Sequence, residues 1–267
     1  MSPIRLPRDS AFARRFTGLI CALTLCSLAM APRAEAEMLF GFTEAANHND
    51  LTVASQNRLL DLEAAAGGEL HRVVLLWKDV EPYLVNGSPV QNWSYYDTVI
   101  NSALARGIRP ILVVMSAPTW AQQALDCQGA HCPPAPSKLT AWSRFIYDTV
   151  KRYPGAAAIE VWNEPNLRGQ WSTREGPDPA RYAQLFNHAA GAAHYADPTM
   201  RVLAGAITYQ DSDVAKKKLS IPTFLEGFYR AGGASQMGAG DGLSLHAYPW
   251  VDELESLDGL FAKTLRQ

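Results

Sequence analysis

The chain has 267 residues, of which 48% are hydrophobic, and its formal net charge is −2 at pH 7. Such a nearly neutral chain has no basic surplus, so we do not expect nucleic acid or an anionic membrane surface as a partner. It has no familiar metal-ligand spacing and no phosphate-binding glycine loop, so we expect neither a metal nor a cofactor.

The first 36 residues have the pattern of a secretory signal peptide. Several arginines precede an apolar run over residues 17–31, and Ala34-Glu35-Ala36 provides a small-x-small cleavage site. The run has about 15 residues, whereas a membrane-spanning helix needs roughly 20. We therefore predict cleavage after Ala36 rather than a membrane anchor, and a secreted or periplasmic protein with no membrane contact after cleavage.

Residues 37–267 then form one domain with a formal charge of −5 and no linker. Two of the four cysteines leave with the signal peptide, and Cys127 and Cys132 remain in a stretch rich in Gly and Pro. In an exported protein this pair predicts one disulfide that closes a loop.

Strand-like and helix-like segments alternate along the predicted domain. Apolar, strand-like runs lie at 38–42, 70–77, 111–115, 156–161, 202–207 and 243–247. Helical periodicity is found over 51–66, 96–104, 139–150, 179–190, 222–231 and 251–266, with Asp178-Pro179 as the N-cap and first residue of the fourth helix.

Strand starts that recur every 32 to 48 residues indicate either a barrel or a doubly wound sheet. A dinucleotide-binding sheet is unsupported, because no Gly-x-Gly-x-x-Gly follows the first strand. The sequence thus predicts an α/β fold, and the family resemblance given below implies the (β/α)8 TIM-barrel type, with about six βα units present in this chain.

The octapeptide Ile159 to Asn166, Ile-Glu-Val-Trp-Asn-Glu-Pro-Asn, is the most informative motif. Its apolar start leads into Asn163 and Glu164, and Pro165 then ends the strand. The carboxyl end of a barrel strand is where catalytic groups lie. Aromatic residues and an imidazole follow other strands, and this combination suits a carbohydrate, because flat rings stack on sugar faces while polar groups bind hydroxyls.

This octapeptide resembles the strand-four signature of clan A glycoside hydrolases, which are retaining (β/α)8 enzymes. Leu245-His246-Ala247-Tyr248-Pro249 is similar to the clan's sixth strand, and Arg72 to its second-strand arginine. The details look most like glycoside hydrolase family 39 and related family 5-like bacterial enzymes. The likeness covers roughly residues 38–250.

The resemblance implies a double-displacement mechanism on a poly- or oligosaccharide. Glu164 would be the general acid/base and Asn163 would bind the sugar 2-hydroxyl, while Arg72 would orient the nucleophile. The remaining predicted substrate-binding residues are aromatic or imidazole side chains: His246, Tyr248, Trp120, Trp171 and Trp250. We expect a monomer.

The family's nucleophile is a Glu at the end of the seventh strand, so we expect it beyond Gln267 and the chain to be C-terminally truncated. Other carboxylates are poor substitutes, and Glu160 is expected to point away from Trp162 and Glu164 on its strand. The alternative is a non-catalytic carbohydrate-binding protein on a degenerate or truncated barrel, which would not need the second carboxylate.

Overall fold

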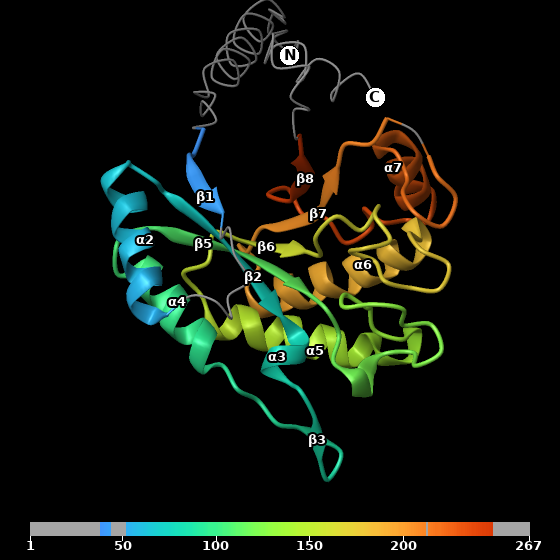
Figure 1. The fold of residues 1–267 in the computed structure, drawn as a ribbon, viewed down its shortest axis with the longest axis horizontal. Helices are drawn as coiled ribbons and strands as arrows, with labels where there is room; N and C mark the ends of the chain where they lie inside the picture. The colour runs from blue at the N-terminus through green and yellow to red at the C-terminus, as the bar shows by residue number, and fades with distance from the viewer. Residues whose placement is uncertain (1–37, 44–51, 212, 248–267) are drawn as a thin grey trace, which may run out of the picture. The chain divides into compact units, whose positions relative to one another are not determined.

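The computed structural model describes residues 38–43, 52–211 and 213–247. Six parallel strands form one sheet whose order follows the chain (Figure 1). They are β1 (Gly41–Thr43), β2 (Leu70–Leu76), β5 (Arg109–Met115), β6 (Ala158–Val161), β7 (Val202–Thr208) and β8 (Gly242–His246). The sheet curls into part of a barrel, which confirms the predicted fold class.

Helices connect successive strands and cover the outer face of the sheet (Figure 1). They are α2 (Val53–Ala65), α4 (Ser94–Leu104), α5 (Leu139–Arg152), α6 (Pro179–Ala196) and α7 (Ile221–Arg230). Asp178 caps α6, because its carboxylate accepts hydrogen bonds from two backbone amides in the first turn. Within the described residues, no helix is both long enough and apolar enough to span a bilayer.

Shorter elements follow the carboxyl end of β2 and lie in the loop after β5. The single-turn helix α3 (Trp77–Val80) follows β2, and β3 (Leu84–Val85) pairs with β4 (Ser88–Pro89) as a hairpin. Two 3₁₀ turns, η2 (Thr119–Ala121) and η3 (Pro136–Lys138), lie between β5 and α5. The predicted signal peptide and the predicted helix over 251–266 lie outside the described residues.

The core lies between the sheet and the helical layer. In β2, His71, Val73 and Leu75 are buried, whereas Arg72 and Val74, which alternate with them, are only partly buried. The contact between His71 and Glu63 of α2 shows that the first set faces the helices. The second set therefore faces the barrel interior, since strand side chains alternate between two faces.

Asn166 ties the segment after β6 to its neighbours. The side chain is fully buried, and its Nδ2 donates to the carbonyls of Thr208 and Leu219 at 2.8 Å each. Its Oδ1 accepts from the Thr208 amide at 3.1 Å. Three hydrogen bonds to backbone thus hold the chain that follows Glu164 against β7 and the start of α7.

We predict that Asn166→Ala lowers the free energy of unfolding by about 2–3 kcal/mol, because buried backbone groups lose their partners. Denaturant titration followed by circular dichroism measures the loss. Asn187→Ala is the control, since among the described residues that half-buried side chain makes a single hydrogen bond, to the Gly232 carbonyl. Equal effects of the two substitutions would contradict the role given to Asn166.

Candidate active site

Unusual backbone conformations gather at the carboxyl ends of the parallel strands. Ser116 after β5, Trp162 and Glu164 after β6, and Ala206 in β7 all have positive φ angles, between 44° and 76°, although none is glycine. Such conformations cost of order 1–3 kcal/mol each and cluster at functional sites. The strained backbone therefore marks this end of the sheet as the candidate site.

Glu164 is held from two sides. Its amide donates to the carbonyl of Ala206 at 3.1 Å, and its Oε1 lies 2.9 Å from Nδ1 of His246 at the end of β8. The register of β7 and β8 shifts between Gly205 and Ile207, which is a β-bulge. Because a bulge re-aims the backbone beside it, this irregularity places the Ala206 carbonyl under Glu164.

The side chains of Glu164 and His246 are each partly exposed. Their side-chain exposures are 14% and 15%, so a ligand at the strand ends can reach them while most of their surface is covered. The structure thus brings the predicted acid/base into direct contact with the predicted imidazole. The catalytic roles of both residues stay predictions.

Arg72 reaches across the barrel interior to β6. Its Nη2 lies 2.5 Å from Oε1 of Glu160 and donates to Oδ1 of Asn163 at 2.9 Å. Its Nε approaches both Glu160 oxygens, at 3.2 and 3.3 Å, and Ser244 of β8 donates to Glu160 at 3.1 Å. One buried carboxylate thus anchors the arginine that contacts the predicted sugar-binding amide.

The expectation that Glu160 points away from Glu164 was wrong. Ser244 and His246 are two residues apart in β8 and therefore lie on the same face of the strand. Ser244 contacts Glu160, and His246 contacts Glu164. Both glutamates therefore face the barrel interior, one layer apart. Trp162 leaves this face because its φ of 76° turns the backbone, so it packs against Trp171 instead.

Trp171 is not a sugar-stacking residue, contrary to the sequence prediction. Its side chain is fully buried and lies edge-on to Trp162 and Tyr182, with the Arg181 guanidinium 6.0 Å from its ring. A loop residue can be buried when the loop folds back over the core, and this one does. Both ring faces are therefore unavailable to a ligand.

The other predicted aromatic residues have different outcomes. Trp120 in η2 is partly exposed, donates to the Glu81 carbonyl at 2.8 Å and meets Trp77 edge-on, so its role as a stacking platform stays a prediction. Tyr248 and Trp250 lie outside the described residues.

Tyr182 of α6 supports β6 from the helical side. Its hydroxyl donates to the Val161 carbonyl at 2.8 Å, and complete burial raises the pKa of the phenol well above its usual value. The negative charge of Glu160 raises this pKa further. The hydroxyl thus stays protonated and remains a donor to the last residue of the strand.

The disulfide loop closes over the end of β5. Cys127 and Cys132 are bonded, and between them His131 places Nδ1 2.8 Å from the hydroxyl of the buried Ser116. Burial lowers the pKa of His131, and the positive charge of Lys78 lowers it further. Among the described residues, no group of three His, Cys, Asp or Glu side chains could hold a metal ion.

Sequence reasoning missed Ser244 and dismissed Glu160. A usable signal was present for Ser244, because it precedes His246 by two residues in the same strand and so shares its face. For Glu160 the same period of two, measured from Glu164, gives the correct side. Its partners could not be read from the sequence, since they come from β2 and β8.

Comparison with known proteins supports the resemblance read from the octapeptide. No family model matches the chain. The chain is 28% identical over 154 residues to a β-xylosidase of Geobacillus stearothermophilus, covering 52% of this chain and 29% of that protein. This identity and the fold together show a protein that resembles the family 39 glycoside hydrolases.

Three solved structures share the fold. A family 39 β-xylosidase from Caulobacter crescentus has a TM-score of 0.61 and 21% identity, covering 88% of this chain and 52% of its own. A monomeric β-xylosidase from the same organism has a TM-score of 0.57 and 22% identity, covering 79% of this chain and 42% of its own. The family 39 enzyme of Xanthomonas axonopodis pv. citri has a TM-score of 0.58 and 18% identity, covering 85% of this chain and 46% of its own. The chain spans about half or less of these relatives.

We predict that Glu160→Gln lowers the free energy of unfolding by about 3–5 kcal/mol, because it leaves the Arg72 guanidinium without its counter-charge in the barrel interior. Chemical denaturation measures the effect. In the double variant Arg72→Met/Glu160→Met the loss should be smaller than the sum of the single losses, since neither charge is then stranded. Strictly additive losses would contradict a coupled pair.

The lowered pKa of His131 predicts a stability that depends on pH. In the unfolded chain the imidazole titrates at about 6.5, so below that pH the unfolded state binds a proton that the folded state does not. The free energy of unfolding should therefore decrease as the pH is lowered from about 7.5 to about 5.5. His131→Asn should remove this part of the decline. If the free energy of unfolding of the variant depends on pH as that of the wild type does, His131 does not cause the decline.

Proposed function

We propose that the chain carries the acid/base half of the active site of a retaining glycoside hydrolase that cleaves β-linked xylo-oligosaccharides. The observation that carries the proposal is Glu164 at the end of β6, bound by His246 and beside the fixed amide of Asn163. The xylosidic substrate class is taken from the β-xylosidases that the chain resembles.

Glu164 would protonate the glycosidic oxygen as the bond breaks and later remove a proton from the attacking water. Its contact with His246 holds one carboxylate oxygen, Oε1, so the other is available to the substrate. Fixing the carboxylate in this way reduces the cost of orienting it for each proton transfer.

Asn163 is oriented for a sugar hydroxyl. Its Oδ1 accepts a hydrogen bond from Arg72, so its Nδ2 is the group left to donate to a ligand. A hydrogen bond from this amide to the 2-hydroxyl strengthens as the oxocarbenium-like transition state forms. Glu160 supports this arrangement indirectly, because it fixes Arg72.

The nucleophile would be a second carboxylate, about 5–5.5 Å from Glu164. We place it on a seventh strand beyond the residues described, as the resemblance implies. Arg72 can receive it, since Nε and Nη2 face Glu160 and Asn163, whereas Nη1 makes no hydrogen bond to any described residue. Glu160 itself is unsuited to attack, because Arg72 and Ser244 occupy its oxygens one layer below Glu164.

The proposal extends to the protein as a whole. We infer that it is exported to the periplasm or the medium, where such saccharides occur, and that it acts as a monomer. The signal pattern over residues 1–36 supports export. The monomeric solved relative supports the second inference.

We predict that Glu164→Gln in the full-length protein lowers kcat/KM for xylobiose by about 10²–10⁴-fold, because its alcohol leaving group needs protonation. Hydrolysis of a dinitrophenyl β-xyloside should fall much less at the glycosylation step, since that leaving group departs unprotonated. Glu226→Gln, which removes an exposed carboxylate of α7, is the matched control.

Azide provides a second readout. In Glu164→Ala it should accelerate turnover of the activated xyloside and yield the β-xylosyl azide, because a small anion can attack the intermediate without a general base. Equal losses on both substrates and no azide product would exclude the acid/base role. Saccharide binding without any hydrolysis by the wild-type protein would instead favour the carbohydrate-binding alternative.

A further inference from the structure

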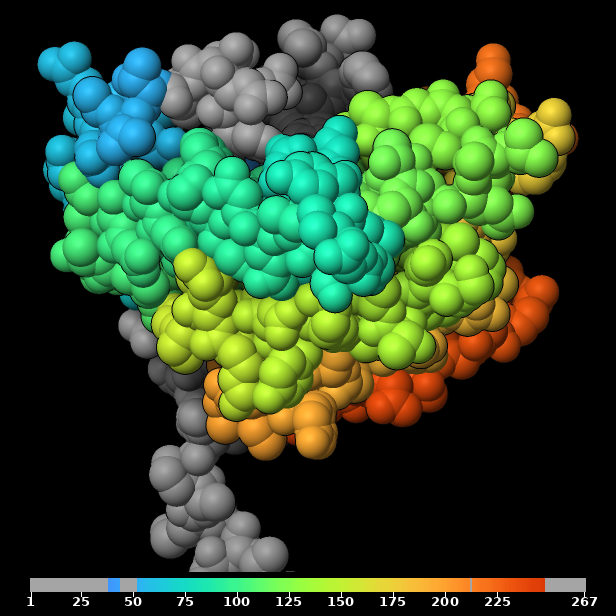
Figure 2. All heavy atoms as spheres, turned by 90° about the horizontal axis from the view of Figure 1, so that it is seen from below, coloured from blue at the N-terminus to red at the C-terminus, as the bar shows by residue number. Residues whose placement is uncertain are grey.

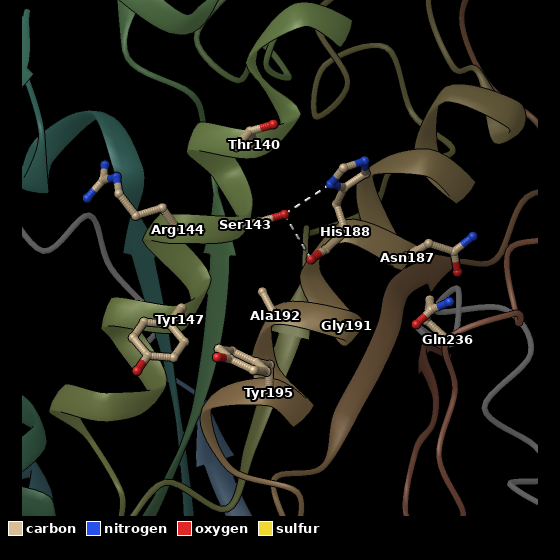
Figure 3. Close-up of a pocket in the computed structure, with 10 residues that line it drawn as sticks. All are labelled: Thr140, Ser143, Arg144, Tyr147, Asn187, His188, Gly191, Ala192, Tyr195 and Gln236. Atoms are coloured by element: carbon tan, nitrogen blue, oxygen red, sulfur yellow. Dashed lines mark hydrogen bonds between the residues drawn. The ribbon is translucent and has the colours of Figure 1, made fainter.

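A groove lies on the outer wall of the barrel, between α5 and α6. It has a volume of about 760 Å³, which is within the range of small-ligand sites. Figure 2 shows the two helices side by side at the surface, α5 in yellow-green and α6 in orange. Gly191 and Ala192 of α6 have almost no side chain, which leaves space between the two helices at the bottom of the groove (Figure 3).

Two tyrosines stand together at one end of this groove (Figure 3). Tyr147 of α5 and Tyr195 of α6 have ring centroids 5.9 Å apart and planes tilted by 36°. Tyr195 is 83% exposed, which is unusual for a large aromatic side chain that caps no core. Tyr195 offers flat apolar surface directly to solvent, and such surface stacks on sugar rings. Tyr147 packs partly against the core, and the Lys151 ammonium lies 5.8 Å from its ring centre.

Five further side chains of the lining can form hydrogen bonds. These are the side chains of Thr140, Ser143, Asn187, His188 and Gln236. Ser143 donates to the His188 carbonyl at 3.2 Å and lies 3.0 Å from Nδ1 of the same residue. These two contacts tie the side chain of α5 to α6 at the edge of the groove.

The one charged residue that lines the groove is already neutralised. Arg144 turns away from α6 (Figure 3), and its guanidinium pairs with Glu81 at 2.5 Å and Asp148 at 2.8 Å. Burial by itself lowers the pKa of Arg144, but the contacts with Glu81 and Asp148 together outweigh it, so the pKa is raised. The groove thus offers an exposed aromatic ring and several polar side chains, and its one lining guanidinium is paired. This combination matches a hydroxyl-rich ligand.

We propose that the α5/α6 groove is a second saccharide-binding site, which holds a xylo-oligosaccharide or a xylan chain on the outside of the barrel. This inference rests on the proposed function for its sugar class. The groove is distinct from the candidate active site, because it lies in the helical layer, whereas Glu164 and His246 face the barrel interior at the strand ends. Binding there would raise the local concentration of substrate around the protein.

The test uses the full-length protein and two probes, xylohexaose in calorimetry and soluble xylan in affinity electrophoresis. All calorimetry is done on Glu164→Gln, so that the probe is not hydrolysed. Tyr195→Ala removes the exposed ring, and Tyr147→Ala/Tyr195→Ala removes the pair. Tyr229→Ala is the matched control, since that tyrosine of α7 is 48% exposed and does not line the groove.

We expect Glu164→Gln to bind two equivalents of xylohexaose and Glu164→Gln/Tyr195→Ala to bind one. Retardation by xylan should weaken at least tenfold in both groove variants and stay unchanged in Tyr229→Ala. Hydrolysis of an aryl xyloside should be unaffected by Tyr195→Ala, because that substrate is too short to reach the outer wall.

Failure of this inference can be told from failure of the proposed function. If the aryl xyloside is hydrolysed while Tyr195→Ala leaves stoichiometry and retardation unchanged, or while the wild type fails to bind xylan, the groove is not a saccharide site. If no xyloside is hydrolysed but Tyr195→Ala abolishes the binding of one equivalent, the groove site stands and the proposed activity falls.

Discussion

The ion pair of Arg72 and Glu160 connects parts of the sheet that do not neighbour one another. β2 and β6 are separated by β5, and β6 and β8 are separated by β7. Contacts from Arg72 to Glu160 and from Ser244 to Glu160 can therefore form only when the sheet is curled. Burying two charges is costly, and the cost is offset here because several hydrogen bonds satisfy them. The same contacts that fix the curvature also fix Asn163, so shape and site depend on one cluster.

The strand ends above this cluster have little freedom to move. Glu164 and Ala206 both have positive φ angles, and the amide of the first donates to the carbonyl of the second. Asn166 holds the segment that follows Glu164 through three hydrogen bonds to the backbone of Thr208 and Leu219. A strained conformation persists only when its surroundings determine it, and these contacts do so. The result is a carboxylate presented to the opening on rigid backbone.

Aromatic residues have two separate roles in this fold. Trp162 and Trp171 pack edge-on beneath the site and give the loop after β6 a solid base. Tyr195 instead faces solvent on the outer wall with 83% of its surface exposed, and it contacts the half-buried ring of Tyr147. Burial thus decides which aromatic rings stabilise the protein and which can meet a ligand.

The sequence by itself predicted the alternation of strands and helices, the barrel class, and the placement of Glu164 and His246 at strand ends. These follow from local information: apolar runs, helical periodicity, a proline that ends a strand and an aspartate that caps a helix. The tertiary structure alone decided that Glu160 is the partner of Arg72 and that Trp171 belongs to the core. The first outcome depends on a contact between residues 88 positions apart in the chain, which leaves no periodic signal in the sequence. The second depends on how the loop after β6 folds back onto Trp162 and Tyr182, which local patterns do not reveal.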